Sequence, residues 1–182
     1  MANTIIAKGK GVRFERLAGG AITPGALVML NSSNALVVHA TAAGYTPPIV
    51  AIEQELFGRD LDTAYANAEH CIGEYLLPGM EAYMLFGIAT HAIVIGDLLE
   101  SAGDGTLREF APLTGTLTGT PDGALADITF NSTWSSGQAN EINVNFEEIQ
   151  VKMNAARASA MFMALEAVGE IAAVTRYRVL VL

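Results

Sequence analysis

The chain has 182 residues and a mass of 19.1 kDa, and its 51 % apolar and 16 % charged residues exclude an intrinsically disordered protein. Its net charge of −9 argues against binding to nucleic acid or to an anionic membrane surface, since both need a basic surface. The single cysteine, Cys71, excludes an internal disulfide, and the length predicts one main domain.

Residues 1–24 are predicted to form an extended, basic N-terminal arm. The first 16 residues carry four bases against the single acid Glu15, a net charge of +3 that leaves −12 for the remainder. The four bases are Lys8, Lys10, Arg13 and Arg16. Only "TIIA" is apolar before charges and glycines intervene. We therefore expect no signal peptide, and we expect the chain to be made in the cytosol.

Residues 25–111 read as short apolar strands separated by turn residues. "GALVML" ends at "NSSN", "ALVVHA" leads into "GYTPP", and "IVAIEQELFG" follows. Pro78-Gly79 then divides "AEHCIGEYLL" from "MEAYMLFG". Residues 158–182 return to the same pattern and end in the alternating run "RYRVLVL". These two stretches together predict a mainly β domain, a small barrel or sandwich.

The stretch "GDLLESAGDGTLREF", residues 96–110, could be a ligand loop or a hairpin. Asp97 and Asp104 stand seven positions apart, too sparse for a calcium cage, and "TLREF" continues as a strand, whereas a phosphate cradle opens onto a helix. A hairpin explains more, because Gly103-Asp104-Gly105 suits a turn with positive φ. Gly96 and Asp97, together with this turn, are therefore predicted to serve backbone geometry.

Residues 112–157 are predicted to be an insertion, a loop rich in Gly, Thr and Ser followed by an amphipathic helix near residues 140–157. Five apolar residues at spacings of 4, 3, 4 and 3 fall on one helical stripe. They are Ile142, Phe146, Ile149, Met153 and Ala156. This spacing fits a coiled-coil seam between subunits, and it equally fits a helix packed on its own sheet.

Catalysis and metal binding have no support in the sequence. His39, His70 and His91 lie in separate strand-like segments, and adjacent strand residues such as His70 and Cys71 point to opposite faces and cannot chelate together. Motifs of serine hydrolases, P-loops, dinucleotide folds and metalloproteases are lacking. We expect no enzyme activity, no metal and no cofactor.

The order of four segments resembles the small capsid decoration, or cement, proteins of tailed bacteriophages. They are "GALVML", then "PPIVAIEQELFGRDLDTAYANAEHCIGEYLLPGMEAYMLFG", then the hairpin, and finally "MALEAVG" with "RYRVLVL". The hairpin follows the pattern G-D-x-L-x-S-x-G-D-G-x-L. "FEEIQVKMNA" is similar to the helical insert of some such proteins, with Ile149 at a leucine position.

The resemblance implies a β-barrel or sandwich, often β-tulip-like, bound to the outer capsid surface at joints between subunits of the major capsid protein. It implies a virion location, a homodimer or homotrimer, and no active site. The basic arm could add a strand to a neighbouring subunit through backbone hydrogen bonds. Its candidate capsid-binding residues are Lys8, Lys10, Arg13, Phe14 and Arg16.

Two other classes of function stay open at this point. A ligand-binding β-domain on the virion, such as a carbohydrate-binding or fibre domain, would need an exposed aromatic platform, for which Trp134 is the only tryptophan. A cytosolic β-barrel enzyme would need His70 or His91 in its chemistry.

Overall fold

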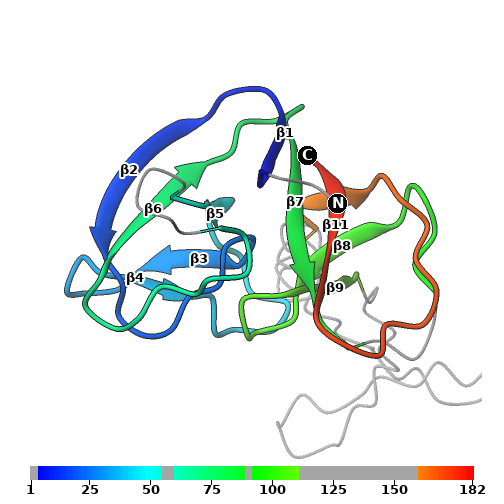
Figure 1. The fold of residues 1–182 in the computed structure, drawn as a ribbon. Coiled ribbons are helices and arrows are strands. Elements are labelled where there is room, and N and C mark those ends of the chain that lie inside the picture. The colour runs from blue at the N-terminus through cyan, green and yellow to red at the C-terminus, as the bar shows by residue number, and fades with distance from the viewer. Residues whose placement is uncertain (1–3, 55–59, 89–91, 111–159) are drawn as a thin grey trace, which may run out of the picture. The chain divides into compact units, whose positions relative to one another are not determined.

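The computed structural model describes residues 4–54, 60–88, 92–110 and 160–182, which form eleven β-strands and, within these ranges, no helix (Figure 1). The strands are β1 (Ile6–Lys8), β2 (Val12–Leu17), β3 (Leu27–Leu30), β4 (Leu36–Val38), β5 (Ile49–Ala51), β6 (His70–Tyr75), β7 (Glu81–Phe86), β8 (Leu98–Ser101), β9 (Leu107–Glu109), β10 (Phe162–Ala164) and β11 (Thr175–Val181). The prediction of a mainly β chain is confirmed.

The strands form two closed rings of the same topology. The N-terminal barrel has the order β2-β6-β5-β3-β4, and a parallel bridge between Ala18 and Leu36 joins its ends. The C-terminal barrel has the order β7-β11-β10-β8-β9, and a parallel pairing of Phe86 with Leu107 closes it. Figure 1 shows the two groups of strands apart. The predicted barrel is therefore present twice.

The register of strand pairing is also the same in both barrels. Leu27 pairs with Val50 in the first barrel, and Leu98 pairs with Met163 in the second. The bridge between Ile22 and Tyr65 recurs as the bridge from Ile93 to Val168. Gly25 N–H donates to Ala51 O at 2.7 Å, as Gly96 N–H donates to Ala164 O at 2.9 Å. The described strands other than β1 thus form an internal repeat of one five-stranded unit.

The hydrophobic core joins the two barrels. Leu27, Val50 and Ile52 of the N-terminal barrel pack in the same buried cluster as Phe86 of the C-terminal barrel. Conversely, Leu85 of β7 belongs to the cluster inside the N-terminal barrel. Burial of apolar area stabilises this contact as it does each barrel.

The N-terminal segment differs from the predicted extended arm of residues 1–24. β1 pairs with β7 as the outermost strand of the C-terminal barrel's sheet, and β2 pairs with β6 along its whole length. Ile5 is fully buried. Five of the six residues of β2 are exposed, so that its polar composition resembles that of a free arm. Residues 4–24 are therefore part of the β domain.

The predicted insertion lies outside the described residues. Residues 111–159, which include the whole of the loop and helix predicted for 112–157, lie between β9 and β10 along the chain. In the N-terminal barrel the equivalent connection, from β4 to β5, needs only the residues between Val38 and Ile49. The second repeat thus has many more residues between its third and fourth equivalent strands than the first.

Candidate interaction surfaces

The basic residues assigned to the arm are divided between two surfaces. Lys8, the last residue of β1, and Lys10 in the turn after it are exposed, and Lys8 Nζ lies 3.5 Å from a carboxylate oxygen of Glu81. Arg13 belongs to β2, and its Nε donates to Glu74 Oε2 at 2.6 Å. Because Glu74 is fully buried, Arg13 has a structural role in addition to any role in binding.

Phe14 and Arg16 of β2 contact each other through their side chains. The Phe14 ring packs against the core of the N-terminal barrel beside Gly73. The Arg16 guanidinium lies 5.8 Å from the centroid of that ring, and its Nε donates to Asn34 Oδ1 at 3.1 Å. This cation–π contact keeps Arg16 on the barrel surface.

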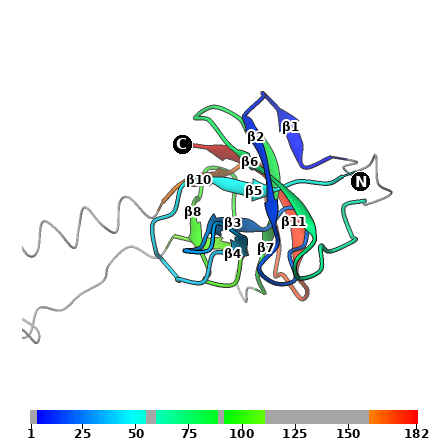
Figure 2. The same cartoon turned by 90° about the vertical axis from the view of Figure 1, so that its left-hand side faces the viewer.

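The outer edge of β1 is a possible place for strand addition. In the sheet of the C-terminal barrel β1 pairs with β7 on one side and, among the described strands, is the last of the order (Figure 2). An edge strand presents backbone N–H and C=O groups that another chain can pair with. Exposed Lys8 and Lys10 stand at this edge and the turn after it.

The predicted hairpin of residues 96–110 uses its carboxylates on its own backbone. β8 and β9 are antiparallel, and Gly103 and Gly105 have φ values of 91° and 82°. Asp97 Oδ2 accepts the Val94 N–H at 2.8 Å. Asp104 Oδ1 accepts the Thr106 N–H at 3.0 Å and its hydroxyl at 2.6 Å. These contacts stabilise the turns and point to no ligand.

The two barrels meet through unlike faces. We call the surface of the N-terminal barrel at this contact its front face; it consists of Pro24, Gly25 and Leu27. It lies against the rear face of the C-terminal barrel, which consists of Leu85, Gly105 and Arg176. Leu85 N–H donates to Gly25 O at 2.9 Å, and Leu27 N–H donates to Gly105 O at 2.7 Å. Arg176 Nε donates to Pro24 O at 2.9 Å. These hydrogen bonds fix the orientation of one barrel on the other.

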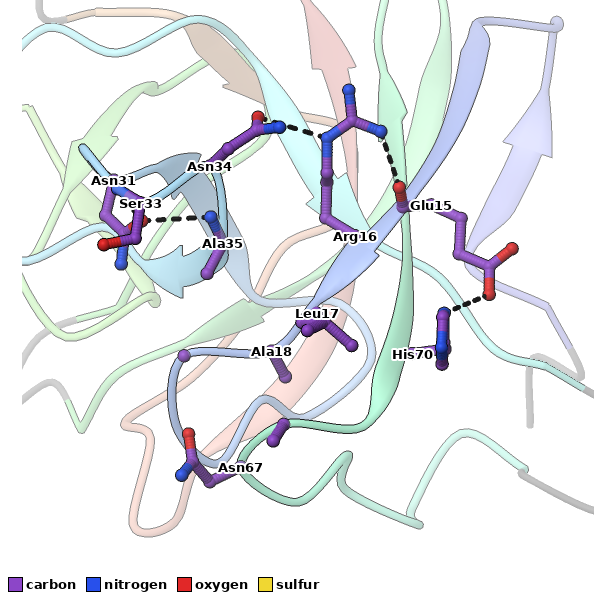
Figure 3. A pocket seen from close by; sticks show the side chains of 12 residues that line it. Glu15, Arg16, Leu17, Ala18, Asn31, Ser33, Asn34, Ala35, Asn67 and His70 are labelled. Atoms are coloured by element: carbon purple, nitrogen blue, oxygen red, sulfur yellow. Dashed lines mark hydrogen bonds and ion pairs between the residues drawn. The ribbon is translucent and has the colours of Figure 1, made fainter.

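An open groove of about 710 Å³ lies on the N-terminal barrel (Figure 3). Leu17, Asn34 and His70 line it, and the His70 ring nitrogen lies 2.8 Å from a carboxylate oxygen of Glu15. The Leu17 side chain is 47 % exposed in it. The groove therefore combines an apolar floor with polar groups at its rim.

A second exposed apolar surface lies on the C-terminal barrel, in the loop before β8. Val94 and Ile95 are 55 % and 65 % exposed, and Leu98 at the start of β8 is 42 % exposed. Neighbouring exposed apolar residues are typical of a surface that contacts another protein.

Of the three histidines and the cysteine, the structure describes His39, His70 and Cys71. Buried His39 shares a 2.7 Å hydrogen bond with Ser101, and desolvation lowers its pKa from 6.5. Desolvation raises the pKa of buried Cys71 to about 12, so this thiol is not a nucleophile at neutral pH. His91 lies outside the described residues. Over those residues, no group of three or more His, Cys, Asp or Glu side chains could hold a metal ion.

The predicted interface residues Ile142, Phe146, Ile149, Met153 and Ala156 also lie outside the described part of the chain. Sequence reasoning missed the front and rear faces. Their signal was the recurrence of Ile22, Gly25 and Leu36 as Ile93, Gly96 and Leu107 at one constant separation.

Comparisons with known proteins add no family. No protein-family profile matches the chain, and no curated protein matches it. In the part of the chain that the structure describes, no helix has the length and apolar character needed to cross a membrane.

Proposed function

We propose that the chain is a structural virion protein that binds the outer surface of a phage capsid and cements joints between subunits of the major capsid protein. The proposal combines the resemblance of the four sequence segments with one structural observation, the position of β1 as an edge strand among the strands that the structure describes. Strand addition at this edge would supply backbone hydrogen bonds to a capsid segment, and Lys8 and Lys10 would attract acidic capsid residues.

Binding at many equivalent joints would stabilise the expanded head. Each copy that binds only the assembled shell shifts the equilibrium away from the dissociated or burst state by mass action. Modest affinity per copy is sufficient, because the contributions add over all occupied joints. This role needs a rigid, stable surface domain rather than a pocket.

The finer fold description belongs to the same proposal: a β-tulip-like barrel that carries one helix near residues 140–157. In this description the stripe of Phe146 and Ile149 joins subunits of a dimer or trimer. A Phe146→Ser/Ile149→Ser variant that stays folded but becomes monomeric would support the seam. A misfolded monomer would support packing of the helix on its own sheet.

The experiment is co-sedimentation with purified expanded heads of the phage that encodes the chain. A deletion of residues 2–16 would remove β1 and all of β2 except Leu17, and so would test folding as well as binding. Reversal of charge by Lys8→Glu/Lys10→Glu avoids this, since both side chains are exposed. We expect at least a tenfold loss of bound protein at equal concentration.

A matched control places new acids elsewhere on the C-terminal barrel. Ala172 and Ala173 are exposed in the loop before β11, so Ala172→Glu/Ala173→Glu adds negative charge without touching β1. This control should bind heads as the parent does. Equal binding by the Lys8/Lys10 variant would remove β1 from the capsid contact, and absence of binding by the parent would overturn the proposed function.

A further inference from the structure

Each barrel has a front face and a rear face, but the contact within one chain uses only one of each. Among the residues that the structure describes, the front face of the C-terminal barrel and the rear face of the N-terminal barrel therefore have no partner of this kind. We propose that these two faces bind each other between chains, so that copies of this protein associate head to tail. The inference goes beyond the proposed function and does not depend on it.

Strand register identifies the residues of the two unused faces. On the front face, the positions of Pro24, Gly25 and Leu27 are taken by Ile95, Gly96 and Leu98. On the rear face, the positions of Leu85, Gly105 and Arg176 are taken by Leu17, Asn34 and His70. The pairing of Leu85 with Arg176 across two strands recurs as the pairing of Leu17 with His70.

The unused front face is apolar and exposed. Leu27 is fully buried by the contact within the chain and by its barrel, whereas Leu98 at the same position is 42 % exposed. Val94 and Ile95 stand where Thr23 and Pro24 stand in the first repeat, and Asp97, which accepts the Val94 N–H, stands where Ala26 does, so this copy of the face has an apolar pair beside one carboxylate. Such a surface gains free energy when another protein covers it.

The unused rear face is the groove of Figure 3. Leu17 lies in it at the position from which Leu85 donates its N–H to Gly25 O. His70 takes the position of Arg176, whose Nε binds Pro24 O. One ring nitrogen of His70 donates to Glu15, so in the neutral ring the other nitrogen is an acceptor for an N–H or hydroxyl of an incoming chain. The groove thus offers an apolar and a hydrogen-bonding contact, while Asn34 carries a side chain where Gly105 has none.

One pair of positions has changed on both faces together. Within the chain, His39 of the front face forms a buried hydrogen bond with Ser101 of the rear face. The equivalent positions on the unused faces hold Phe110 and Leu30. A polar pair is thus replaced by an apolar pair. If only one of the two positions were apolar, the polar group opposite it would be buried without a hydrogen bond, so two surfaces that meet require both changes.

A contact between unlike faces has a defined consequence for assembly. It is heterologous, so each chain offers one front and one rear face, and association ends when a ring closes or continues as an open fibre. A contact between like faces would instead stop at a two-fold dimer. The two possibilities separate in a mixing experiment.

The experiment measures the mass of the full chain by light scattering after size exclusion. We expect the parent to run as an oligomer of the 19.1 kDa chain. Ile95→Asp on the front face and Leu17→Asp on the rear face should each shift it to the monomer, with far-UV circular dichroism unchanged. Tyr45→Asp is the control, because Tyr45 is exposed and belongs to neither face.

An equimolar mixture of the two monomeric variants should form a one-to-one dimer and nothing larger. Each variant keeps one intact face, and only the front face of the Leu17→Asp chain matches the rear face of the Ile95→Asp chain. A monomeric parent, or two variants that stay apart when mixed, would overturn the inference. An oligomer lost only in Phe146→Ser/Ile149→Ser would assign assembly to the predicted helix instead. Capsid binding by a monomeric parent would leave the proposed function intact.

Discussion

Gly25 and Gly96 occupy the same position in the two barrels and differ in what covers them. Both have positive φ, 91° and 96°, and both donate their N–H to the equivalent strand. A Cβ on Gly25 would lie 3.1 Å from Tyr83 O and 3.2 Å from Arg176 Nε, whereas a Cβ on Gly96 would meet no atom within 4 Å. Both glycines share the strained backbone conformation, but only Gly25 lies in the contact between the barrels. A comparison of the two positions therefore separates the energy of the strain from that of the contact.

Substitution of the two glycines by alanine should therefore have unequal effects. Gly96→Ala carries only the cost of a left-handed backbone, about 1–2 kcal/mol. Gly25→Ala carries the same cost, and its methyl group also displaces backbone at the interface. We expect this overpacking to lower the free energy of unfolding by about a further 1–3 kcal/mol. Urea unfolding of both variants in the Leu17→Asp background, which we expect to be monomeric, measures the difference. Equal destabilisation would show that the contact between the barrels adapts to a methyl group.

The buried carboxylate of Glu74 predicts that Arg13 is needed for stability. Glu74 accepts hydrogen bonds from Arg13 Nε at 2.6 Å and from Gly11 N–H at 2.7 Å. Arg13→Ala would remove one of these two donors and leave the buried Glu74 carboxylate with the Gly11 N–H. Because the Arg13 side chain is itself 57 % exposed, we expect a loss of about 1–3 kcal/mol, less than for a fully buried pair.

The control for this prediction is Lys10→Ala, which removes an exposed base from the same segment. Its free energy of unfolding should stay within about 0.5 kcal/mol of the parent. If Arg13→Ala is equally neutral, the ion pair with Glu74 does not stabilise the barrel. The comparison also shows why Lys8 and Lys10, not Arg13, are the residues to change in capsid-binding tests.

Cys71 should be protected from thiol reagents in the folded protein. Its side chain is buried in the N-terminal barrel, and desolvation raises its pKa to about 12, so only about one molecule in 10⁴ is a thiolate at pH 8. We expect labelling by a disulfide reagent to be at least about 1,000-fold slower than in 8 M urea. Rapid labelling of the native chain would contradict the burial of this strand.

The strands and the hairpin were accessible to sequence reasoning because local chemistry determines them. Turn signals such as Pro78-Gly79 separate apolar runs, and Gly103 and Gly105 supply the positive φ that a tight turn between β8 and β9 requires. These features need only a few consecutive residues, so that no knowledge of distant contacts is necessary.

The duplication was not predicted because its period is interrupted. Residues 22–38 recur at 93–109 with constant spacing, but the connection after β9 is far longer than that after β4, so no fixed period spans the chain. The arm was misassigned for a different reason. β2 is held by its backbone pairing with β6, and its exposed polar side chains carry no sign of that pairing.

His39 predicts that stability falls when the pH is lowered from 8 to 5.5. Burial lowers the pKa of His39 in the folded state below 6.5, so the unfolded chain binds a proton first as the pH decreases. The contribution of neutral His39 is therefore fully present above pH 6.5 and is lost as the pH falls toward the folded pKa. The slope cannot exceed about 1.4 kcal/mol per pH unit for one group.

The measurement is the free energy of unfolding in urea at several pH values for the parent and for His39→Gln. Glutamine keeps a polar group within reach of the Ser101 hydroxyl, 2.7 Å from the imidazole in the parent, and does not titrate. The variant should lose the part of the slope between pH 6.5 and 5.5, whatever its stability at pH 8. Parallel curves for the two proteins would show that His39 takes up a proton as readily in the folded chain as in the unfolded one. In that case the buried hydrogen bond to Ser101 would be compatible with the charged imidazole, and the contact between the barrels would not weaken in acid through this residue.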